Sequence, residues 1–413
     1  MPRNIRVVIV VVFALTLLVF ATPMYCKAIP RFLRDVRKGC VRLTDVCALE
    51  KNIDNRMFFK EFLVTLGGLA DRFLGKTFCN GIVKVKGTEC LVFPSAETRL
   101  EVEDLSSRCI AYHHYLKAHN VPFLFILVPY KMDWRGDMLK GVPGIVGKTL
   151  YDDSGQFVQS LSAAGVDVVD LTKRYAETPE AVMENFYRTD HHWNGDASLR
   201  ATKEIVTTVL ERLGEPKDAS RLLDDEQWNR HVIRDCWIGS QGRRVGPMFA
   251  GKDDFIYHTP RFETSFTFEI PVLELRCQGR YEETCLRTNR LERGARSLYG
   301  YNPYAVYGGG DYQVTLITNG RPRCKKRILL LKDSFGLPVM TQMATVFEKV
   351  VVIDPRGCAN IAELSLREPY NMVIQLVDVG AMLPQKGWEE RGAPTEKAFF
   401  DYGLERLNSA YGR

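Results

Sequence analysis

The sequence predicts an α/β fold with a mostly parallel sheet, because short apolar runs rich in β-branched residues alternate with helical patterns, as in βαβ units. Such runs occupy residues 121–128 (VPFLFILV), 166–171, 328–331, 350–353 and 372–377. The first is apolar throughout, as expected for a strand that is buried on both faces. With 413 residues, of which 46% are hydrophobic, the chain is long enough for a sizeable core.

Helical patterns fill several intervals between these runs. A short helix is expected over residues 156–164. A longer helix begins after Asn194, which suits the N-cap position, and ends at Gly214, with apolar residues recurring every four positions between them. A surface helix over 108–120 carries three of the seven histidines. An amphipathic helix is expected within 43–75.

The stretch from about residue 226 to 322 differs, because scattered Gly, Pro, aromatic and Arg residues replace sustained helical patterns. Alternating strands are expected over 262–275 and 312–318, so we interpret the stretch as an insertion or β-rich subdomain within one core. The chain then divides into residues 1–26 (transmembrane anchor or signal segment), 27–75 (basic juxtamembrane segment and connecting helix), 76–225 (first half of the core), 226–322 (insertion) and 323–413 (second half).

The N-terminal region predicts attachment to a membrane. Residues 7–26 contain no charge over 20 positions, which suffices to cross a bilayer and favours an uncleaved anchor over a cleaved signal peptide. Six basic residues follow and account for most of the net charge of +6: Lys27, Arg31, Arg34, Arg37, Lys38 and Arg42. Such a cluster beside an apolar segment favours a membrane surface, and not a nucleic acid, as partner. The positive-inside rule alone would keep the body in the cytoplasm, so sidedness stays open.

The eleven cysteines allow two interpretations. Cys40/Cys47, Cys79/Cys90 and Cys277/Cys285 are close enough in sequence to form disulfides, but spacing does not establish pairing. Buried free thiols are the alternative. The chain contains no C-x-x-C pair, which argues against a zinc ribbon or a thioredoxin-like site.

Two short motifs supply the parts of a nucleophilic site. Residues 189–194 (TDHHWN) offer a carboxylate and an imidazole two positions apart, and residues 332–336 (KDSFG) offer a hydroxyl at the end of an apolar run. Side chains at i and i+2 of an extended segment share a face, so Asp190 can hold the ring of His192. Ser334 lies between a predicted parallel strand and a helix, where α/β sheets bind ligands. These residues match the nucleophile, base and orienting acid of a Ser-His-Asp site.

Neighbouring residues have further predicted roles. His191 is expected to point to the opposite side and to be structural. The amide of Gly336, at the start of a helix, is a candidate oxyanion donor, and Trp193 could shield the Asp-His pair or stack against a sugar. Taken alone, the serine would more often be a helix N-cap and the Asp-His pair a surface contact. Both motifs at strand ends of one core favour the catalytic hypothesis.

Residues 187–193 (YRTDHHW), followed by a glycine-containing helix, resemble the signature of the bacterial DHHW family, which is related to the alginate O-acetyltransferases of the SGNH-hydrolase-like superfamily. Residues 128–131 (VPYK), 307–311 (YGGGD) and 354–356 (DPR) support it, and the resemblance spans about residues 55–380. It implies an SGNH-like (flavodoxin-like) three-layer core and the Ser334, His192 and Asp190 triad acting on acyl esters of a polysaccharide. Lys332 stands where hydrolases of the superfamily usually have glycine.

Further residues are candidates for contact with the oxyanion or with the substrate. Gly309 and Gly310 join Gly336 as oxyanion candidates, and Asn302 and Asn319 are alternatives. For Lys131 and Arg356, contact with an acidic glycan competes with a surface salt bridge.

Together these observations predict a membrane-anchored, extracytoplasmic O-acetyltransferase or acetylesterase that acts on a cell-envelope polysaccharide. A membrane-bound acyltransferase is the expected source of acetyl groups, and no cofactor or metal is expected. A non-catalytic glycan-binding or export-scaffold protein of the same fold is the alternative. A metal-dependent phosphoesterase that uses residues 190–192 as ligands is less favoured, because such sites need further clustered Asp or His residues.

Overall fold

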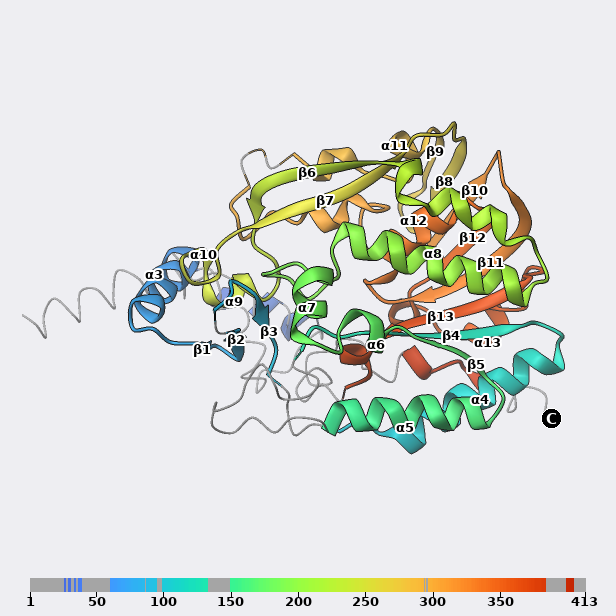
Figure 1. Cartoon of the computed structure of the whole chain (residues 1–413), viewed down its shortest axis with the longest axis horizontal. Helices are drawn as coiled ribbons and strands as arrows, with labels where there is room; N and C mark the ends of the chain where they lie inside the picture. The colour runs from blue at the N-terminus through green and yellow to red at the C-terminus, as the bar shows by residue number, and fades with distance from the viewer. Residues whose placement is uncertain are drawn as a thin grey trace, which may run out of the picture.

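The computed structural model describes residues 60–85, 87–94, 99–132, 149–292, 294, 296–383 and 399–404, together with a few residues between 26 and 38. Its centre is an eight-stranded mixed sheet with the strand order β5-β4-β13-β11-β12-β10-β8-β9 (Figure 1). The strands from β5 to β12 in this order are parallel, and the last three are antiparallel. The fold is therefore an α/β fold with a mixed, largely parallel sheet.

The five parallel strands lie where the apolar runs predict them. They are β4 (Phe123–Val128), β5 (Asp167–Asp170), β11 (Cys324–Lys332), β12 (Phe347–Ile353) and β13 (Met372–Asp378). Every residue of β4 and β13 is buried, which explains why β4 is apolar throughout and β13 is mostly apolar. Because β11 lies between β12 and β13, its carboxyl end opens at the middle of the sheet.

Helices cover both faces of the sheet. Figure 1 shows α8 (Gly195–Arg212) and α12 (Gly336–Met343) on one side and α4 (Val102–Ala118) and α5 (Thr149–Ala163) on the other. Asn194 caps α8 as predicted, because its side chain accepts a hydrogen bond from the amide of Ala197. Both α4 and α5 begin six or more residues earlier than predicted. The short helices are α6 (Thr172–Tyr175), α7 (Pro179–Asn185), α11 (Tyr281–Thr284) and α13 (Ile361–Leu364).

Residues 226–322 are joined to the central sheet. β8 (Phe266–Ile270), β9 (Leu275–Gly279) and β10 (Val314–Asn319) extend it beyond β12. β6 (Trp228–Trp237) and β7 (Asp253–Pro260) form a separate two-stranded ribbon, and α9 (Gly242–Val245) and α10 (Pro247–Ala250) lie between them in sequence. The predicted insertion is thus rich in strands, and part of it completes the sheet of the core.

The segment before the core forms an outlying unit. The helix α3 (Lys60–Phe73) packs on α9 and α10, and β1 (Phe78–Cys79), β2 (Ile82–Lys84) and β3 (Leu91–Val92) form a small sheet. The predicted anchor over residues 7–26 lies outside the described residues except for Cys26. Among the helices that the structure describes, none is long and apolar enough to cross a membrane.

Two of the cysteine pairs suggested by spacing are not disulfides. Cys79, Cys90, Cys277 and Cys285 all have free thiols. Burial raises the pKa of the Cys79 thiol to about 11 and that of Cys285 to about 12. Cys40 and Cys47 lie outside the described residues.

Candidate active site

Ser334 lies in the tight turn that joins the central strand β11 to α12. The carboxylate of Asp333 shapes this turn by accepting hydrogen bonds from the amides of Phe335, at 2.8 Å, and Asp378, at 2.5 Å. Gly336 permits the turn, because a Cβ there would lie 2.6 Å from the Cβ of Lys332. The serine is thereby held at the carboxyl edge of the sheet, as predicted from its place in the sequence.

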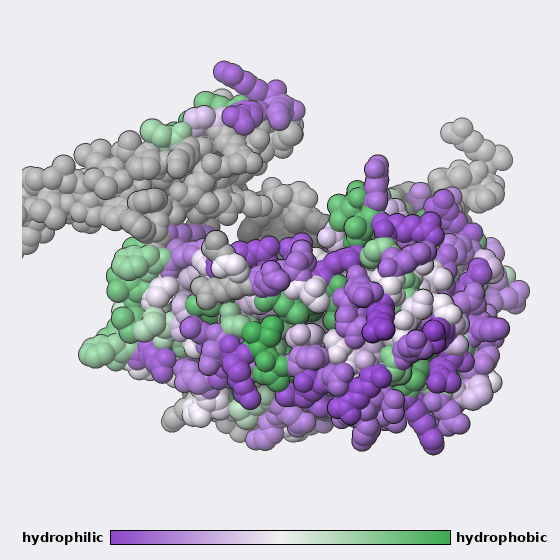
Figure 2. All heavy atoms as spheres, turned by 90° about the horizontal axis from the view of Figure 1, so that it is seen from above, coloured by the Kyte–Doolittle hydropathy of each residue, from purple (hydrophilic) through white to green (hydrophobic). Residues whose placement is uncertain are grey.

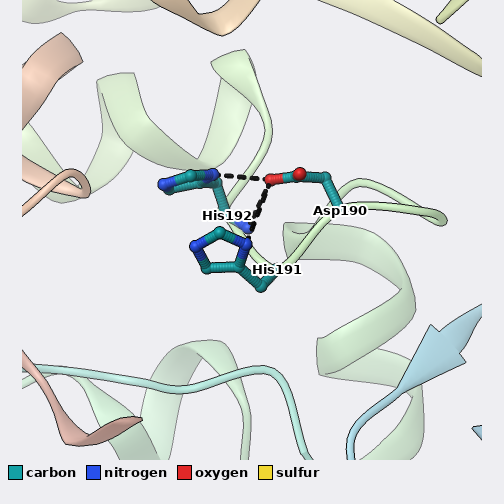
Figure 3. Close-up of side chains that lie close together, drawn as sticks. All are labelled: Asp190, His191 and His192. Carbon is teal, nitrogen blue, oxygen red and sulfur yellow. Dashed lines mark hydrogen bonds and ion pairs between the residues drawn. The ribbon is translucent and has the colours of Figure 1, made fainter. Parts of the chain in front are cut away.

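The Asp190–His192 segment is a closed bend. Phe186 pairs with Trp193 in an isolated bridge, and the amide of Tyr187 donates to the carbonyl of His192. The predicted opposite orientation of His191 is therefore wrong, because the two-residue alternation holds only in an extended chain. The ring centroids of His191 and His192 lie 3.9 Å apart, and both imidazoles lie close to the carboxylate of Asp190 (Figure 3).

The structure brings Ser334, His192 and Asp190 into one hydrogen-bonded chain. His192 Nε2 lies 2.8 Å from Ser334 Oγ, and His192 Nδ1 lies 2.5 Å from Asp190 Oδ1. An ionised carboxylate can only accept, so Nδ1 carries the proton and Nε2 accepts the hydrogen bond from the serine hydroxyl. This is the geometry needed for proton transfer from a serine to an imidazole.

The carboxylate of Asp190 is held in its ionised form. Burial acts to raise its pKa, but the electrostatic interactions with the imidazoles of His192 and His191 and the hydrogen bonds from His192 and the Ser240 amide outweigh that effect. The pKa of Asp190 therefore lies well below its usual range. Burial, with the neighbouring charge of His192, lowers the pKa of His191 to about 3, so His191 is neutral at physiological pH. Its Nδ1 lies 2.6 Å from Ser240 Oγ.

Lys131 is a buried structural residue, so neither of the two roles considered for it, contact with a glycan or a surface salt bridge, is present. The side chain is fully buried, which lowers the pKa of its ammonium group. Its Nζ donates to the carbonyls of Tyr187, Arg188 and Asp190 and to Gln241 Oε1, at 2.5, 2.8, 3.0 and 3.0 Å. Lys131 thus holds the loop that carries Asp190.

Two aromatic residues pack around the imidazole of His192. Trp193 is fully buried and packs against Phe335, so it shields the site and is not available for stacking on a sugar. Tyr304 stacks on His192 with ring centroids 4.0 Å apart and an interplanar angle of 18°. These contacts fix the plane of the imidazole. Sequence reasoning missed Tyr304, because it comes from the insertion and has no distinguishing pattern.

An ion cluster lies beside the turn of Ser334. Lys332, which is 1% exposed, pairs with Asp311, and Arg356 bridges Asp354 at 2.5 Å and Asp311 at 3.6 Å. The predicted salt bridge of Arg356 is therefore present, and one third of the side chain remains exposed. Lys332, which replaces the usual glycine, joins β11 to the loop over 307–311 and leaves the Ser334–His192 contact intact.

The candidate oxyanion donors differ in availability. The Gly336 amide donates to the main-chain carbonyl of Asp333, and the Phe335 amide donates to the carboxylate of Asp333. Gly336 is therefore not a free donor, contrary to the prediction. The amide of Ser334 makes no hydrogen bond within the described part of the chain, and the same is true of Gly309. The Gly310 amide donates to the main-chain carbonyl of Tyr307.

Asn319 is also unavailable as an oxyanion donor. Its side chain is buried, and its Nδ2 donates to the carbonyls of Ala344 and Thr345 at 2.9 and 3.1 Å. It thus stabilises the chain at the end of β10.

A metal fits these residues poorly. Asp190, His191 and His192 offer ligand atoms within 4.8 Å of one another, and no fourth Asp, Glu, His or Cys joins them among the described residues. Nδ1 of His192 and Nδ1 of His191 are already hydrogen-bonded to Asp190 and Ser240. These contacts orient the site for a proton chain and compete with ligation.

Comparison with known proteins agrees with this architecture. A family model for the SGNH hydrolase-like domain of acetyltransferase AlgX matches residues 94–229, which include Asp190 and His192. The predicted resemblance is confirmed. No curated protein matches the chain.

Solved structures share the SGNH-like fold. PatB1 from Bacillus cereus is similar with a TM-score of 0.59 and 21% identity, over 74% of this chain and 97% of that chain. A PatB1 structure with a sulfonyl adduct gives a TM-score of 0.57, 21% identity and coverage of 74% and 95%. A DHHW family protein from Eubacterium siraeum gives a TM-score of 0.56, 14% identity and coverage of 77% and 97%. At these identities the likeness establishes the fold alone.

Proposed function

We propose that the protein is a membrane-anchored, extracytoplasmic Ser-His-Asp O-acetyltransferase or acetylesterase that acts on a cell-envelope polysaccharide. The observation that carries the proposal is the distance of 2.8 Å between Ser334 Oγ and His192 Nε2, with Asp190 bonded to the opposite nitrogen. The family match to an acetyltransferase domain supports acyl transfer as the reaction class.

The geometry supports a two-step reaction. In the first step, Ser334 Oγ bonds to the acetyl carbonyl carbon while its proton passes to His192 Nε2, and Asp190 stabilises the imidazolium. The free Ser334 amide is placed to donate to the developing oxyanion, and each such donor contributes a factor of about 100–1000 in rate. His192 then returns the proton to the leaving oxygen, and the acetyl group remains on Ser334.

In the second step, His192 takes a proton from the acceptor hydroxyl, whose oxygen bonds to the acetyl carbonyl carbon of the acetyl-serine. The bond between the acetyl group and Ser334 Oγ then breaks, and His192 returns the proton to Ser334 Oγ. A sugar hydroxyl as acceptor gives transfer, and water gives hydrolysis. In the transfer reaction, the acetyl donor would come from a membrane-bound acyltransferase, which suits a protein that is anchored near it. The polysaccharide would then be modified outside the cell.

The test is intact mass spectrometry after treatment with an aromatic sulfonyl fluoride. The wild-type protein should gain one sulfonyl group, Ser334→Ala should gain none, and the control Ser162→Ala, at an exposed position, should behave as wild type. Of these three proteins, only the wild type and Ser162→Ala should release acetate from an activated ester. Acetate release that persists in Ser334→Ala would remove the proposal. A folded wild-type protein without any adduct would instead favour the non-catalytic glycan-binding function.

A further inference from the structure

The helix α3 carries an apolar face that the body of the protein leaves exposed. We define the α3 apolar face as Phe62, Leu63, Leu66, Leu69, Phe73 and Leu74, whose exposed fractions run from 38% to 89%. The spacing of Phe62, Leu66, Leu69 and Phe73 places these four on one side of the helix. Figure 2 shows hydrophobic residues gathered at the end of the molecule where Figure 1 places α3.

A different side of α3 attaches it to the body. Gly68 is buried against α9, where an added Cβ would lie 2.1 Å from the carbonyl oxygen of Val245. Thr65 shares a hydrogen bond of 2.9 Å with Tyr299, and Arg72 donates to the carbonyl of Met248. The helix is therefore fixed to the protein by its small and polar side, and its apolar side points outward. This is the reverse of the orientation expected for a helix that only stabilises a core.

The chain itself indicates what covers this face. The uncharged run of residues 7–26 precedes α3 in the same chain, and the six basic residues between Lys27 and Arg42 would attract anionic headgroups. Among the described residues of that basic segment, Ile29 and Leu33 are also exposed. Exposed apolar side chains beside a basic segment fit an anionic lipid surface better than a neutral protein surface.

We propose that α3 lies along the membrane surface, with its apolar face inserted among the lipid headgroups. An interfacial helix of this kind is buried by roughly 5–10 Å, and α3 would cover about 21 Å of the surface. The proposal concerns orientation and holds whichever reaction the body performs. It adds a second, rigid attachment to the one predicted for residues 7–26.

The attachment of α3 connects the membrane contact to the triad. α3 rests on α9, which begins at Gly242. The two residues before it hold the site, because the Ser240 amide donates to Asp190 Oδ2 at 2.6 Å and Gln241 accepts from Lys131. A bilayer that holds α3 therefore sets the direction in which the triad faces.

The test places a fluorescent side chain on the α3 apolar face of the full chain. Phe73→Trp is bound to vesicles of phosphatidylcholine and phosphatidylglycerol whose acyl chains are brominated, and the wild-type signal is subtracted. We expect quenching by the bromolipid and a blue shift of the Phe73→Trp emission. The control Val272→Trp, at a 62% exposed position between β8 and β9, should show neither effect.

Emission of Phe73→Trp that matches the control, with equal quenching by aqueous acrylamide, overturns the proposal. Protection from acrylamide without quenching by bromolipid also overturns it, because a second copy or another protein would then cover the face. If Phe73→Trp does not fold, Leu74→Trp, at a 66% exposed position, gives the same readout.

Discussion

Lys131 shows how one buried residue positions a site that it does not enter. The three N–H donors of its ammonium group are shared among four acceptors that surround the Asp190 loop. A charged group without exposure is stable in a protein only when its donors are satisfied, so the loop and the lysine depend on each other.

Replacement of Lys131 by Met should destabilise the protein strongly. Three main-chain carbonyls would lose their donor in a buried site, and we expect the free energy of unfolding to fall by about 3–5 kcal/mol. Urea denaturation followed by circular dichroism measures this. Lys117→Met, in the last turn of α4, is the control and should change stability by less than about 0.5 kcal/mol. A stable Lys131→Met protein with only a raised KM would restore the predicted contact with substrate.

Asp333 and Asp378 form a buried carboxyl pair beneath the turn of Ser334. Burial, together with the charge and hydrogen bond of Asp333, raises the pKa of Asp378 well above its usual value. Asp378 therefore carries the proton and donates a hydrogen bond to the carboxylate of Asp333. Asp333 remains ionised and can accept the hydrogen bond from the Phe335 amide. The pair positions the turn without contacting a substrate.

The raised pKa of Asp378 predicts a pH dependence of stability. A group whose pKa is higher in the folded state stabilises that state fully below its unfolded pKa of about 3.9, and the contribution is lost as the pH rises through the folded pKa. Asp378→Asn keeps a donor to Asp333 but does not titrate. We expect the stability of the wild type to fall relative to Asp378→Asn as the pH rises above the unfolded pKa of about 3.9, measured by urea denaturation at a series of pH values. A constant difference across this series would contradict the assignment of the proton to Asp378.

At the scale of elements, the strands were predictable and the ends of the helices were less so. The run over 121–128 is apolar throughout and that over 372–377 is apolar apart from Gln375, which suffices to indicate strands buried on both faces, and the structure confirms them. The starts of α4 and α5 were missed, although both have acidic residues in their first turns; at α4 no side chain caps the N-terminus. The bend at 187–193 was missed because it is closed by a hydrogen bond between the Tyr187 amide and the His192 carbonyl, which no side-chain pattern indicates.

The site was only partly predictable for a related reason. Two short motifs contain Ser334, His192 and Asp190, and their residue types indicate a nucleophilic site. Ser240 and Tyr304, which hold Asp190 and His192, come from a different part of the chain and have no local pattern. Their roles arise from tertiary contacts, which sequence spacing does not encode.

α8, the longest helix of the described chain, begins directly after the Asp190–His192 bend. The contribution of its N-terminal cap can be tested. Asn194 accepts from the Ala197 amide at 2.9 Å and donates to the carbonyl of Glu184 at 2.7 Å. Asn194→Ala should lower the free energy of unfolding by about 1–2 kcal/mol in urea denaturation. Thr207→Ala, on the exposed side of the same helix, should have an effect below about 0.5 kcal/mol. Equal losses in the two variants would show that the cap contributes nothing specific.

At the scale of the whole molecule, the stretch over 226–322 is bound to the core by many contacts, and three of them show how it supports the site. β10 pairs with β12 in the sheet, Asp311 pairs with Lys332, and the Ser240 amide holds Asp190. The position of the Asp190 carboxylate thus depends on a segment that lies between the two sequence motifs of the site.

This arrangement predicts that the insertion and the core unfold together. Circular dichroism reports mainly on the helices of the core, and tryptophan emission includes Trp228 and Trp237 at the two ends of β6. Because the sheet runs through both parts, the two signals should change at the same urea concentration, as in a two-state transition. Ester hydrolysis should be lost at that concentration as well, since the Ser240–Asp190 contact breaks with the insertion. A tryptophan transition at lower urea, with helical structure retained, would show instead that the insertion is an independent subdomain.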